Sequence, residues 1–297
     1  MYPRTFQYHR AGSLKEAAGM LASLGEEARL LAGGQSLIPL MKMRFSNPAH
    51  LVDLNFISGT SFIKQEDGAI RFGAMTRHAE IEDSPVAASV PILHDCAAGI
   101  ADVQVRNRGT IGGSVAEADP SGDWAACLLT LTTEVRCLGP RGERTVPLPE
   151  FTTDAYTTVL ARDELVSEIL VKIPPRGSGG CYLAFKRAAP VYPSAAVGVQ
   201  LTVLDGVCSD AAIALSAVGL TAIRAREAEN ALRGQPLTPK TIEAAAEAAR
   251  AASDPQPDMR GSAEYKRQLV VALTKRAIGI AERRARGQHV EGGHIYA

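Results

Sequence analysis

The stretch Leu31-Ala-Gly-Gly-Gln-Ser-Leu-Ile-Pro39 decides the fold of this chain of 297 residues. Residues 28–32, apolar except for Arg29, predict a short buried strand before the glycines, and residues 37–43 predict a short helix after them. A glycine turn between a strand and a helix brings backbone amides together, because glycine has no Cβ and adopts positive φ. Converging amides bind anions, so we interpret this turn as a candidate phosphate cradle.

A second glycine segment, Arg108-Gly-Thr-Ile-Gly-Gly-Ser114, precedes Asp119-Pro-Ser-Gly-Asp123. Its adjacent glycines and hydroxyl groups suit the same anion, although each segment alone is typical of an ordinary turn. The two glycine segments together are a stronger indication of a phosphate site than either one alone. Neither segment matches the G-x-G-x-x-G fingerprint or the P-loop, so a Rossmann or P-loop fold finds no support.

Working outward, the sequence predicts a small βαβ unit, then an antiparallel sheet with covering helices, then a hairpin and three helices. Ser13 is expected to cap the first helix and Thr221 the first of the last three, while Asp205-Gly206 predicts a tight hairpin turn. Residues 174–180, rich in proline and glycine, predict a linker. The other expected strands are 50–54, 69–74, 134–138, 143–148, 165–173, 195–204 and 207–218, and the other expected helices are 85–98, 124–131, 238–252 and 263–286.

Composition excludes several classes of function. The formal net charge is zero at a pI near 7.0, which offers no general attraction for nucleic acid. No apolar run reaches signal-peptide or membrane-span length, which predicts a cytoplasmic protein without a transmembrane segment; any membrane association would be indirect, through a complex. The five cysteines are scattered without ligand spacing, which predicts buried structural thiols and no metal site. No catalytic nucleophile is predicted, since Ser36 lacks the G-x-S-x-G context.

The ordered motifs resemble those of a known family, the FAD-binding subunits of molybdenum hydroxylases, including aerobic carbon monoxide dehydrogenase and the flavin domain of xanthine dehydrogenase. The resemblance covers nearly the whole chain. It is carried by Phe6-Gln-Tyr-His-Arg10, Ala32-Gly-Gly-Gln-Ser-Leu-Ile-Pro39, His50-Leu-Val-Asp-Leu54, Gly109-Thr-Ile-Gly-Gly113, Asp119-Pro120, Lys186-Arg187 and Tyr192.

The resemblance implies an α+β fold of two parts. The first, residues 1–177, would be an FAD-binding domain of the vanillyl-alcohol-oxidase (PCMH) type, with subdomains 1–57 and 58–177. The second, residues 178–287, would be a carbon monoxide dehydrogenase flavoprotein-like domain with a three-stranded antiparallel sheet and a three-helix bundle, followed by a tail, 288–297.

The resemblance also implies which residues bind FAD. The first segment would wrap the pyrophosphate and the second would complete the pocket, while Asp123 would meet the sugar-like portion and Lys186 and Tyr192 the flavin ring. The implied set is Ala32, Gly33, Gly34, Gln35, Ser36, Leu37, Thr110, Ile111, Gly112, Gly113, Ser114, Asp123, Lys186 and Tyr192.

Several of these positions also have an ordinary structural interpretation. Family members often carry His where Gln35 stands and Asn where Ser114 stands, and both replacements keep a hydrogen-bonding side chain. Asp123 is equally typical of a helix N-cap. Lys186 also suits a solvated strand end, and Tyr192 a packing residue.

The implied function is electron transfer by an FAD-carrying oxidoreductase subunit, most similar to that of carbon monoxide dehydrogenase. Electrons would come from [2Fe-2S] clusters on a small subunit and leave to a quinone, NAD or oxygen, with the molybdenum cofactor on a large subunit, in a dimer of heterotrimers. Two alternatives stay open: a stand-alone flavin oxidase or reductase of the same fold, and an assembly module without flavin. The substrate is open among carbon monoxide, purines, nicotine-like heterocycles and aldehydes.

Overall fold

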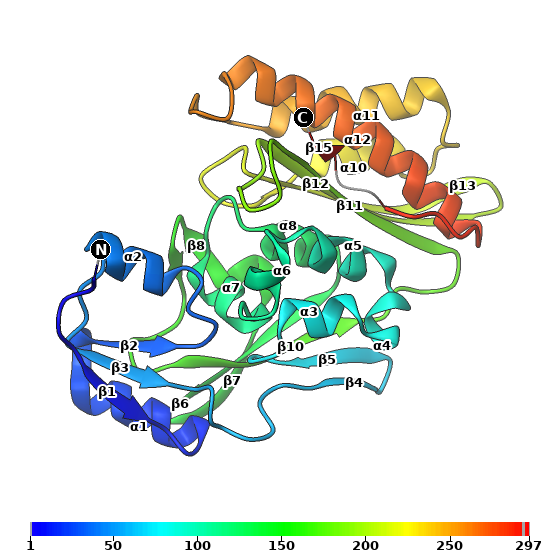
Figure 1. Ribbon diagram of the computed structural model, residues 1–297. Coiled ribbons are helices and arrows are strands. Elements are labelled where there is room, and N and C mark those ends of the chain that lie inside the picture. The colour runs from blue at the N-terminus through cyan, green and yellow to red at the C-terminus, as the bar shows by residue number, and fades with distance from the viewer. Residues whose placement is uncertain (1, 293–294, 297) are drawn as a thin grey trace.

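The computed structural model describes residues 2–292 and 295–296. The chain folds into three units that follow one another in the sequence (Figure 1). The first unit is a parallel sheet in the order β1-β3-β2, in which Gln7 and Ala28 both lie opposite His50. Ser13 caps its helix by accepting a hydrogen bond from the Glu16 amide, as predicted. The elements of this unit are β1 (Gln7–Arg10), α1 (Leu14–Leu24), η1 (Gly25–Glu27), β2 (Ala28–Leu31), α2 (Leu37–Met43) and β3 (His50–Asp53).

The second unit is the predicted antiparallel sheet with covering helices, in the order β4-β5-β10-β6-β7. Its apolar cluster surrounds Phe72, Trp124 and Phe151, all fully buried. The elements are β4 (Ile63–Glu66), β5 (Ala69–Gly73), α3 (His78–Glu82), α4 (Pro85–Ala88), α5 (Pro91–Gly99), α6 (Val103–Arg106), α7 (Ile111–Glu117), α8 (Asp123–Leu129), β6 (Thr133–Gly139), β7 (Gly142–Pro147), α9 (Leu148–Phe151), β8 (Thr152–Asp154), β9 (Thr157–Thr158) and β10 (Leu165–Lys172).

The third unit is a sheet whose outer face is covered by three helices, with their own apolar cluster between the layers (Figure 1). The hairpin at Asp205-Gly206 is confirmed, and both residues have positive φ, 50° and 81°. The elements are β11 (Ser178–Lys186), β12 (Ala195–Leu204), β13 (Val207–Ser216), β14 (Ile223–Arg224), α10 (Arg226–Leu232), α11 (Pro239–Ala252), α12 (Ala263–Ala285) and β15 (Ile295–Tyr296).

Two predictions for the third unit were wrong. The sheet has five strands in the order β14-β13-β12-β11-β15, because a two-residue strand is added at each edge of the expected three. The predicted cap Thr221 does not begin α10, because Ile223 and Arg224 first pair with β13, and the N-cap is Ala225.

Two other element boundaries also differ from prediction. The predicted linker 174–180 becomes strand from Ser178, because Gly179 packs against α12, where a Cβ would lie 2.2 Å from the Ala281 carbonyl oxygen. The predicted helix 85–98 is broken into α4 and α5. Val90 precedes Pro91, which disfavours helical geometry, and has φ −121° and ψ 85°.

A buried ion pair joins the second and third units. Asp95 of α5 and Arg284 of α12 form a bidentate pair through both Nη atoms, with N–O distances of 2.5 and 3.0 Å and side-chain exposures of only 1% and 8%. Arg284 also donates to the carbonyl oxygens of Gly180 and Val290, and Asp95 accepts from the Tyr182 amide. These contacts tie a helix, a strand and the last helix of the chain at one point.

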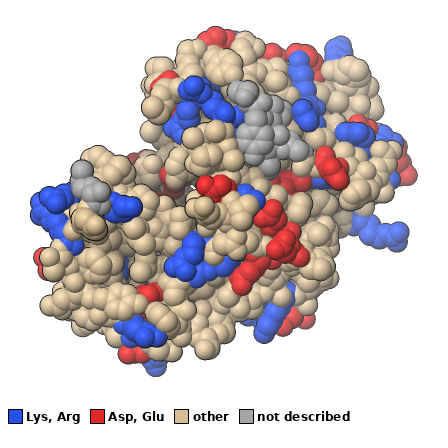
Figure 2. All heavy atoms as spheres, in the orientation of Figure 1, with Lys and Arg blue, Asp and Glu red and all other residues tan. Residues whose placement is uncertain are grey.

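The surface carries charges of both signs. Figure 2 shows acidic and basic groups distributed over one face, some next to each other and some surrounded by uncharged surface. All five cysteines are buried, as predicted. In the part of the chain that the structure describes, no helix has both the length and the apolar character needed to cross a bilayer.

Replacing Arg284 by Ala tests the buried pair. We expect unfolding free energy to fall by about 3–5 kcal/mol, because the substitution breaks an ion pair in which both side chains are buried. Arg286→Ala is the control, since Arg286 forms only a half-exposed i,i+4 pair with Glu282, and the expected loss is about 0.3–0.5 kcal/mol. Urea denaturation of the full chain measures both, and equal losses would contradict the interpretation.

Candidate cofactor pocket

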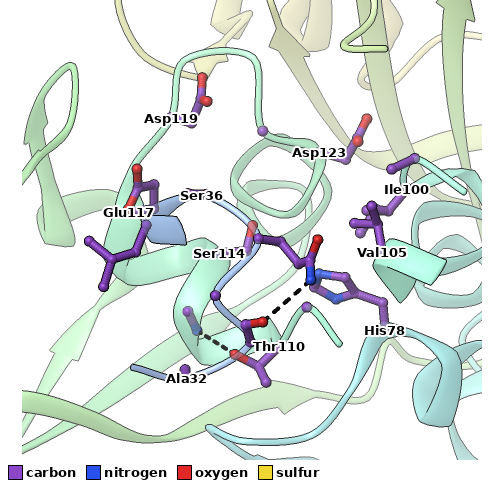
Figure 3. Close-up of a pocket in the computed structure, with 18 of the residues that line it drawn as sticks. Ala32, Ser36, His78, Ile100, Val105, Thr110, Ser114, Glu117, Asp119 and Asp123 are labelled. Carbon is purple, nitrogen blue, oxygen red and sulfur yellow. Dashed lines mark hydrogen bonds between the residues drawn. The ribbon is translucent and has the colours of Figure 1, made fainter. Parts of the chain in front are cut away.

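One pocket lies where the three units meet, and the two glycine segments form its floor (Figure 3). It encloses about 1170 Å3 of empty space, part of it open to solvent. Twelve of the fourteen predicted site residues line it: Ala32, Gly33, Gly34, Gln35, Ser36, Leu37, Thr110, Gly113, Ser114, Asp123, Lys186 and Tyr192. The other two, Ile111 and Gly112, lie behind the pocket wall and are fully buried.

The first glycine segment presents unpaired amides to this pocket. Gly34 has φ 74°, which turns the chain into α2, and the N-cap Ser36 makes no side-chain cap bond. Within the described residues, the backbone amides of 33–36 donate to no protein acceptor. The Gln35 side chain turns back and donates weakly to the Gly33 carbonyl oxygen, at 3.4 Å. Four consecutive free donors therefore remain for a ligand, as an anion site requires.

The two glycine segments pack directly against each other. A Cβ on Gly33 would lie 2.3 Å from the Arg108 carbonyl oxygen and 2.7 Å from the Cα of Gly109. The φ of Gly33 is not positive, so the requirement for glycine here is space alone. Gly112 is confined in the same way by Ala74, whose Cβ and backbone would lie 2.5–2.7 Å away.

The amides of the second segment donate hydrogen bonds to other groups of the protein. The sequence had suggested that both segments offer their amides to the same anion. The Ile111 and Gly112 amides donate to carbonyl oxygens of Thr76 and Ala74, both at 3.0 Å. The Gly113 amide donates to the Thr110 hydroxyl at 3.1 Å, as a helix cap. This segment therefore offers hydroxyl groups and a smooth wall, while the free amides belong to the first segment.

Asp123 and Lys186 form a buried polar cluster, so two of their alternative interpretations were wrong. Asp123 is the first residue of α8 and not its cap, because Gly122 holds the N-cap position. Its carboxylate accepts from the Tyr182 hydroxyl at 3.0 Å and lies 3.6 Å from Lys186 Nζ. Lys186 is 1% exposed and also donates to the Gly99 carbonyl oxygen, so it is no solvated strand end.

The mouth of the pocket is acidic. Glu117 and Asp119 line it beside Tyr192, which is 48% exposed and lies between Val191 and Pro193. Burial and the Asp119 charge raise the pKa of both Glu117 and Tyr192 above their ordinary values. Since Lys186 is paired with Asp123, the lining contains no unpaired cation among the described residues, and a bound anion would depend on amides and hydroxyls.

The sequence reasoning missed His78. It lines the pocket from the start of α3, is 5% exposed, and accepts a hydrogen bond at Nδ1 from Trp124 Nε1 at 3.1 Å. Burial first, then the charges of Arg77 and Arg106, lower its pKa from the ordinary 6.5 to about 3. The imidazole is therefore neutral at physiological pH. Other lining residues not predicted are Leu30, Ile100, Ala101, Val105, Gly109, Glu117, Asp119, Gly122, Pro190 and Val191.

Comparison with known protein families agrees with this geometry. Residues 4–175 match the family described as the FAD binding domain in molybdopterin dehydrogenase, and residues 180–281 match the carbon monoxide dehydrogenase flavoprotein C-terminal domain. The chain therefore belongs to the family of FAD-binding molybdopterin dehydrogenase flavoproteins. It is an FAD-dependent oxidoreductase chain, which confirms the class implied by the sequence resemblance.

Individual relatives span the full length of the chain. It is 39% identical to the carbon monoxide dehydrogenase medium chain of Hydrogenophaga pseudoflava, covering 95% of this chain and 98% of that one. It is 40% identical to subunit alpha of the 6-hydroxypseudooxynicotine dehydrogenase complex of Paenarthrobacter nicotinovorans, covering 96% and 97%. A solved carbon monoxide dehydrogenase structure from Hydrogenophaga pseudoflava superposes with TM-score 0.93 at 40% identity, covering 96% and 99%.

Gly33→Ala tests the contact between the glycine segments. We expect it to lower the unfolding free energy by about 1–3 kcal/mol, because the added methyl group must displace backbone at Arg108 and Gly109. Gly19→Ala in α1 is the control: nothing lies within 4 Å of its added Cβ, so stability should rise by about 0.5–1 kcal/mol. Chemical denaturation checks both, and an unchanged Gly33→Ala variant would refute the close contact.

The neutral state of His78 predicts a pH dependence. Because its folded pKa of about 3 lies below the ordinary 6.5, the unfolded chain binds a proton first as pH falls. The stabilising contribution is full above pH 6.5 and is lost progressively towards pH 3. Wild type should therefore lose unfolding free energy faster than His78→Gln between about pH 7 and about pH 4, by up to ~1.4 kcal/mol per pH unit. Parallel declines in denaturation experiments would argue against a buried neutral imidazole.

Proposed function

We propose that this chain holds FAD in the described pocket and acts as the electron-transferring medium subunit of a molybdenum hydroxylase complex of the carbon monoxide dehydrogenase type. The observation that carries the proposal is the row of four unpaired amides at 33–36, on the pocket floor of a chain from an FAD-binding family. We place the boundary between its FAD-binding domain and C-terminal domain at residue 177.

The pocket residues fit the parts of FAD. The amides of 33–36 suit the pyrophosphate, because they supply positive dipoles without requiring a cation. The hydroxyls of Ser36, Thr110 and Ser114 add donors beside them. Ile111 and Gly112 would act from behind, by holding the wall against β5 and α3.

The polar cluster suits the remainder of the cofactor. Asp123, held by Tyr182 and Lys186, can accept hydrogen bonds from sugar hydroxyl groups. Tyr192, at the half-exposed mouth, suits an aromatic wall for the flavin ring. FAD itself, when bound, supplies the redox chemistry by accepting and passing on one or two electrons. The protein positions it, excludes water from its inner end and leaves one edge accessible.

The proposed partners are a large subunit with the molybdenum cofactor and a small subunit with [2Fe-2S] clusters, in a dimer of heterotrimers in the cytoplasm. Relatives named for carbon monoxide and for 6-hydroxypseudooxynicotine dehydrogenases are almost equally similar to this chain. This fits a subunit that passes on electrons while the substrate is oxidised elsewhere in the complex.

An absorption spectrum of the purified chain, with the released cofactor identified by chromatography, tests the proposal. We expect flavin bands, release of FAD on denaturation, and co-purification from the native host with molybdenum and iron. Robust turnover of reduced organic substrates by the isolated chain would instead establish a stand-alone flavin enzyme. Failure to bind FAD on reconstitution would leave an assembly module.

A further inference from the structure

His78 is held in the pocket wall by its contacts with Gly109 and Trp124. Its backbone amide donates to the Gly109 carbonyl oxygen at 3.1 Å, and its ring packs closely on Gly109, where a Cβ would be 2.6 Å from Nε2. The ring is more than nine-tenths buried. Its position is therefore fixed by backbone, and a side chain at residue 109 would displace it.

Trp124 determines which imidazole nitrogen carries the proton. An indole N–H can only donate, so the Nδ1 atom that receives it at 3.1 Å must be the unprotonated acceptor. A neutral imidazole carries one hydrogen, which is thereby assigned to Nε2. The pair thus converts His78 into a hydrogen-bond donor of fixed tautomer.

That donor faces the pocket. No described residue accepts a hydrogen bond from Nε2, and Nε2 is not among the enclosed side-chain atoms that lack a partner, so it is open to the cavity that His78 lines. Figure 3 places His78, Ile100 and Val105 on the side of the pocket opposite Glu117 and Asp119. Asp123 lies on the same side of the pocket as His78, but its carboxylate is held by Tyr182 and Lys186. Among the described residues no hydrogen bond joins Asp123 to His78, so the Nε2–H group remains available to a ligand.

We propose that His78 is a cofactor-binding residue whose Nε2–H donates a hydrogen bond to an acceptor atom of the bound dinucleotide. The acceptor is a lone-pair atom: a ring nitrogen or carbonyl oxygen of a heterocycle, or an oxygen of the pyrophosphate. The inference rests on the proposed function, in which FAD occupies this pocket. Trp124 serves as the positioning residue, because it acts on the ligand only through the tautomer of His78.

Two substitutions separate the two hydrogen bonds of the ring. In His78→Asn, the amide oxygen replaces Nδ1 as the acceptor for Trp124, while the pocket-side donor is lost. In His78→Gln, the longer side chain brings its amide nitrogen to about the place of Nε2, so the pocket-side donor is kept. Both variants therefore carry an amide side chain, but only His78→Gln keeps the hydrogen-bond donor that faces the pocket.

The measurement is the dissociation constant of FAD for the full-length apoprotein, with circular dichroism to check the fold. We expect His78→Asn to weaken FAD binding about 3- to 10-fold, the range for one hydrogen bond, and His78→Gln to stay within about 2-fold of wild type. Wild-type affinity in folded His78→Asn, or equal losses in both variants, would overturn the proposal. Equal losses would mean that His78 only supports the wall.

Binding of ADP and of FMN identifies the half of the dinucleotide that His78 meets. If the acceptor lies in the ADP half, His78→Asn weakens ADP binding and leaves the flavin absorption maxima unchanged. If it lies in the flavin half, FMN binding weakens and the maxima shift. Either result supports the hydrogen bond. If His78→Asn binds both ADP and FMN as tightly as wild type does, the proposal is overturned.

A measurement on the unmodified chain covers the case in which a variant does not fold. The imidazole nitrogen shifts of His78 should show protonated Nε2 in the apoprotein, and the Nε2–H resonance should move downfield when FAD is added. An Nδ1-protonated ring, or a resonance unaffected by bound FAD, would overturn the inference. Wild type that binds no FAD would instead refute the proposed function, and the two failures are thus distinguishable.

Discussion

The close approach of the two glycine segments is the constraint on which the pocket depends. At Gly33 the space beside the Arg108 carbonyl oxygen is too small for a methyl group, so the first segment reaches the second only as bare backbone. This contact aligns the start of α2 with the wall built from α7, and it joins the small parallel sheet to the large antiparallel one. Everything that lines the floor, including the four free amides, takes its position from that contact.

The pocket must bind an anion although most of the charged side chains that line it are acidic. Three carboxylates, Glu117, Asp119 and Asp123, line the pocket, and the single lysine is committed to Asp123. A pyrophosphate in such a place gains little from ion pairing and much from backbone dipoles, which are fixed in direction by the fold. Such dipoles require no reorganisation on binding. A site of this kind also depends less on ionic strength than one built from exposed lysines and arginines.

Local signals in the sequence predicted the local elements, and non-local packing explains the rest. The strand, glycine turn and helix at 28–43 were correct because each signal lies within a few residues of its effect. The alternative interpretation of Lys186 as a solvated strand end was wrong because its burial depends on Gly99 and Asp123, far away in the chain. His78 carried no signal at all, since its role comes from Trp124, 46 residues later. The need for glycine at position 112 likewise comes from a distant residue, since a Cβ there would collide with Ala74.

The hydrogen bond between His78 and Trp124 has one further consequence. Trp124 is the only tryptophan in the sequence, and its indole is fully buried next to the pocket wall. Intrinsic fluorescence excited at the tryptophan band therefore originates from one place in the molecule. A flavin in the pocket would lie close enough to that indole to quench its emission by energy transfer. The protein thus contains its own optical reporter, through which cofactor loading can be followed without a label.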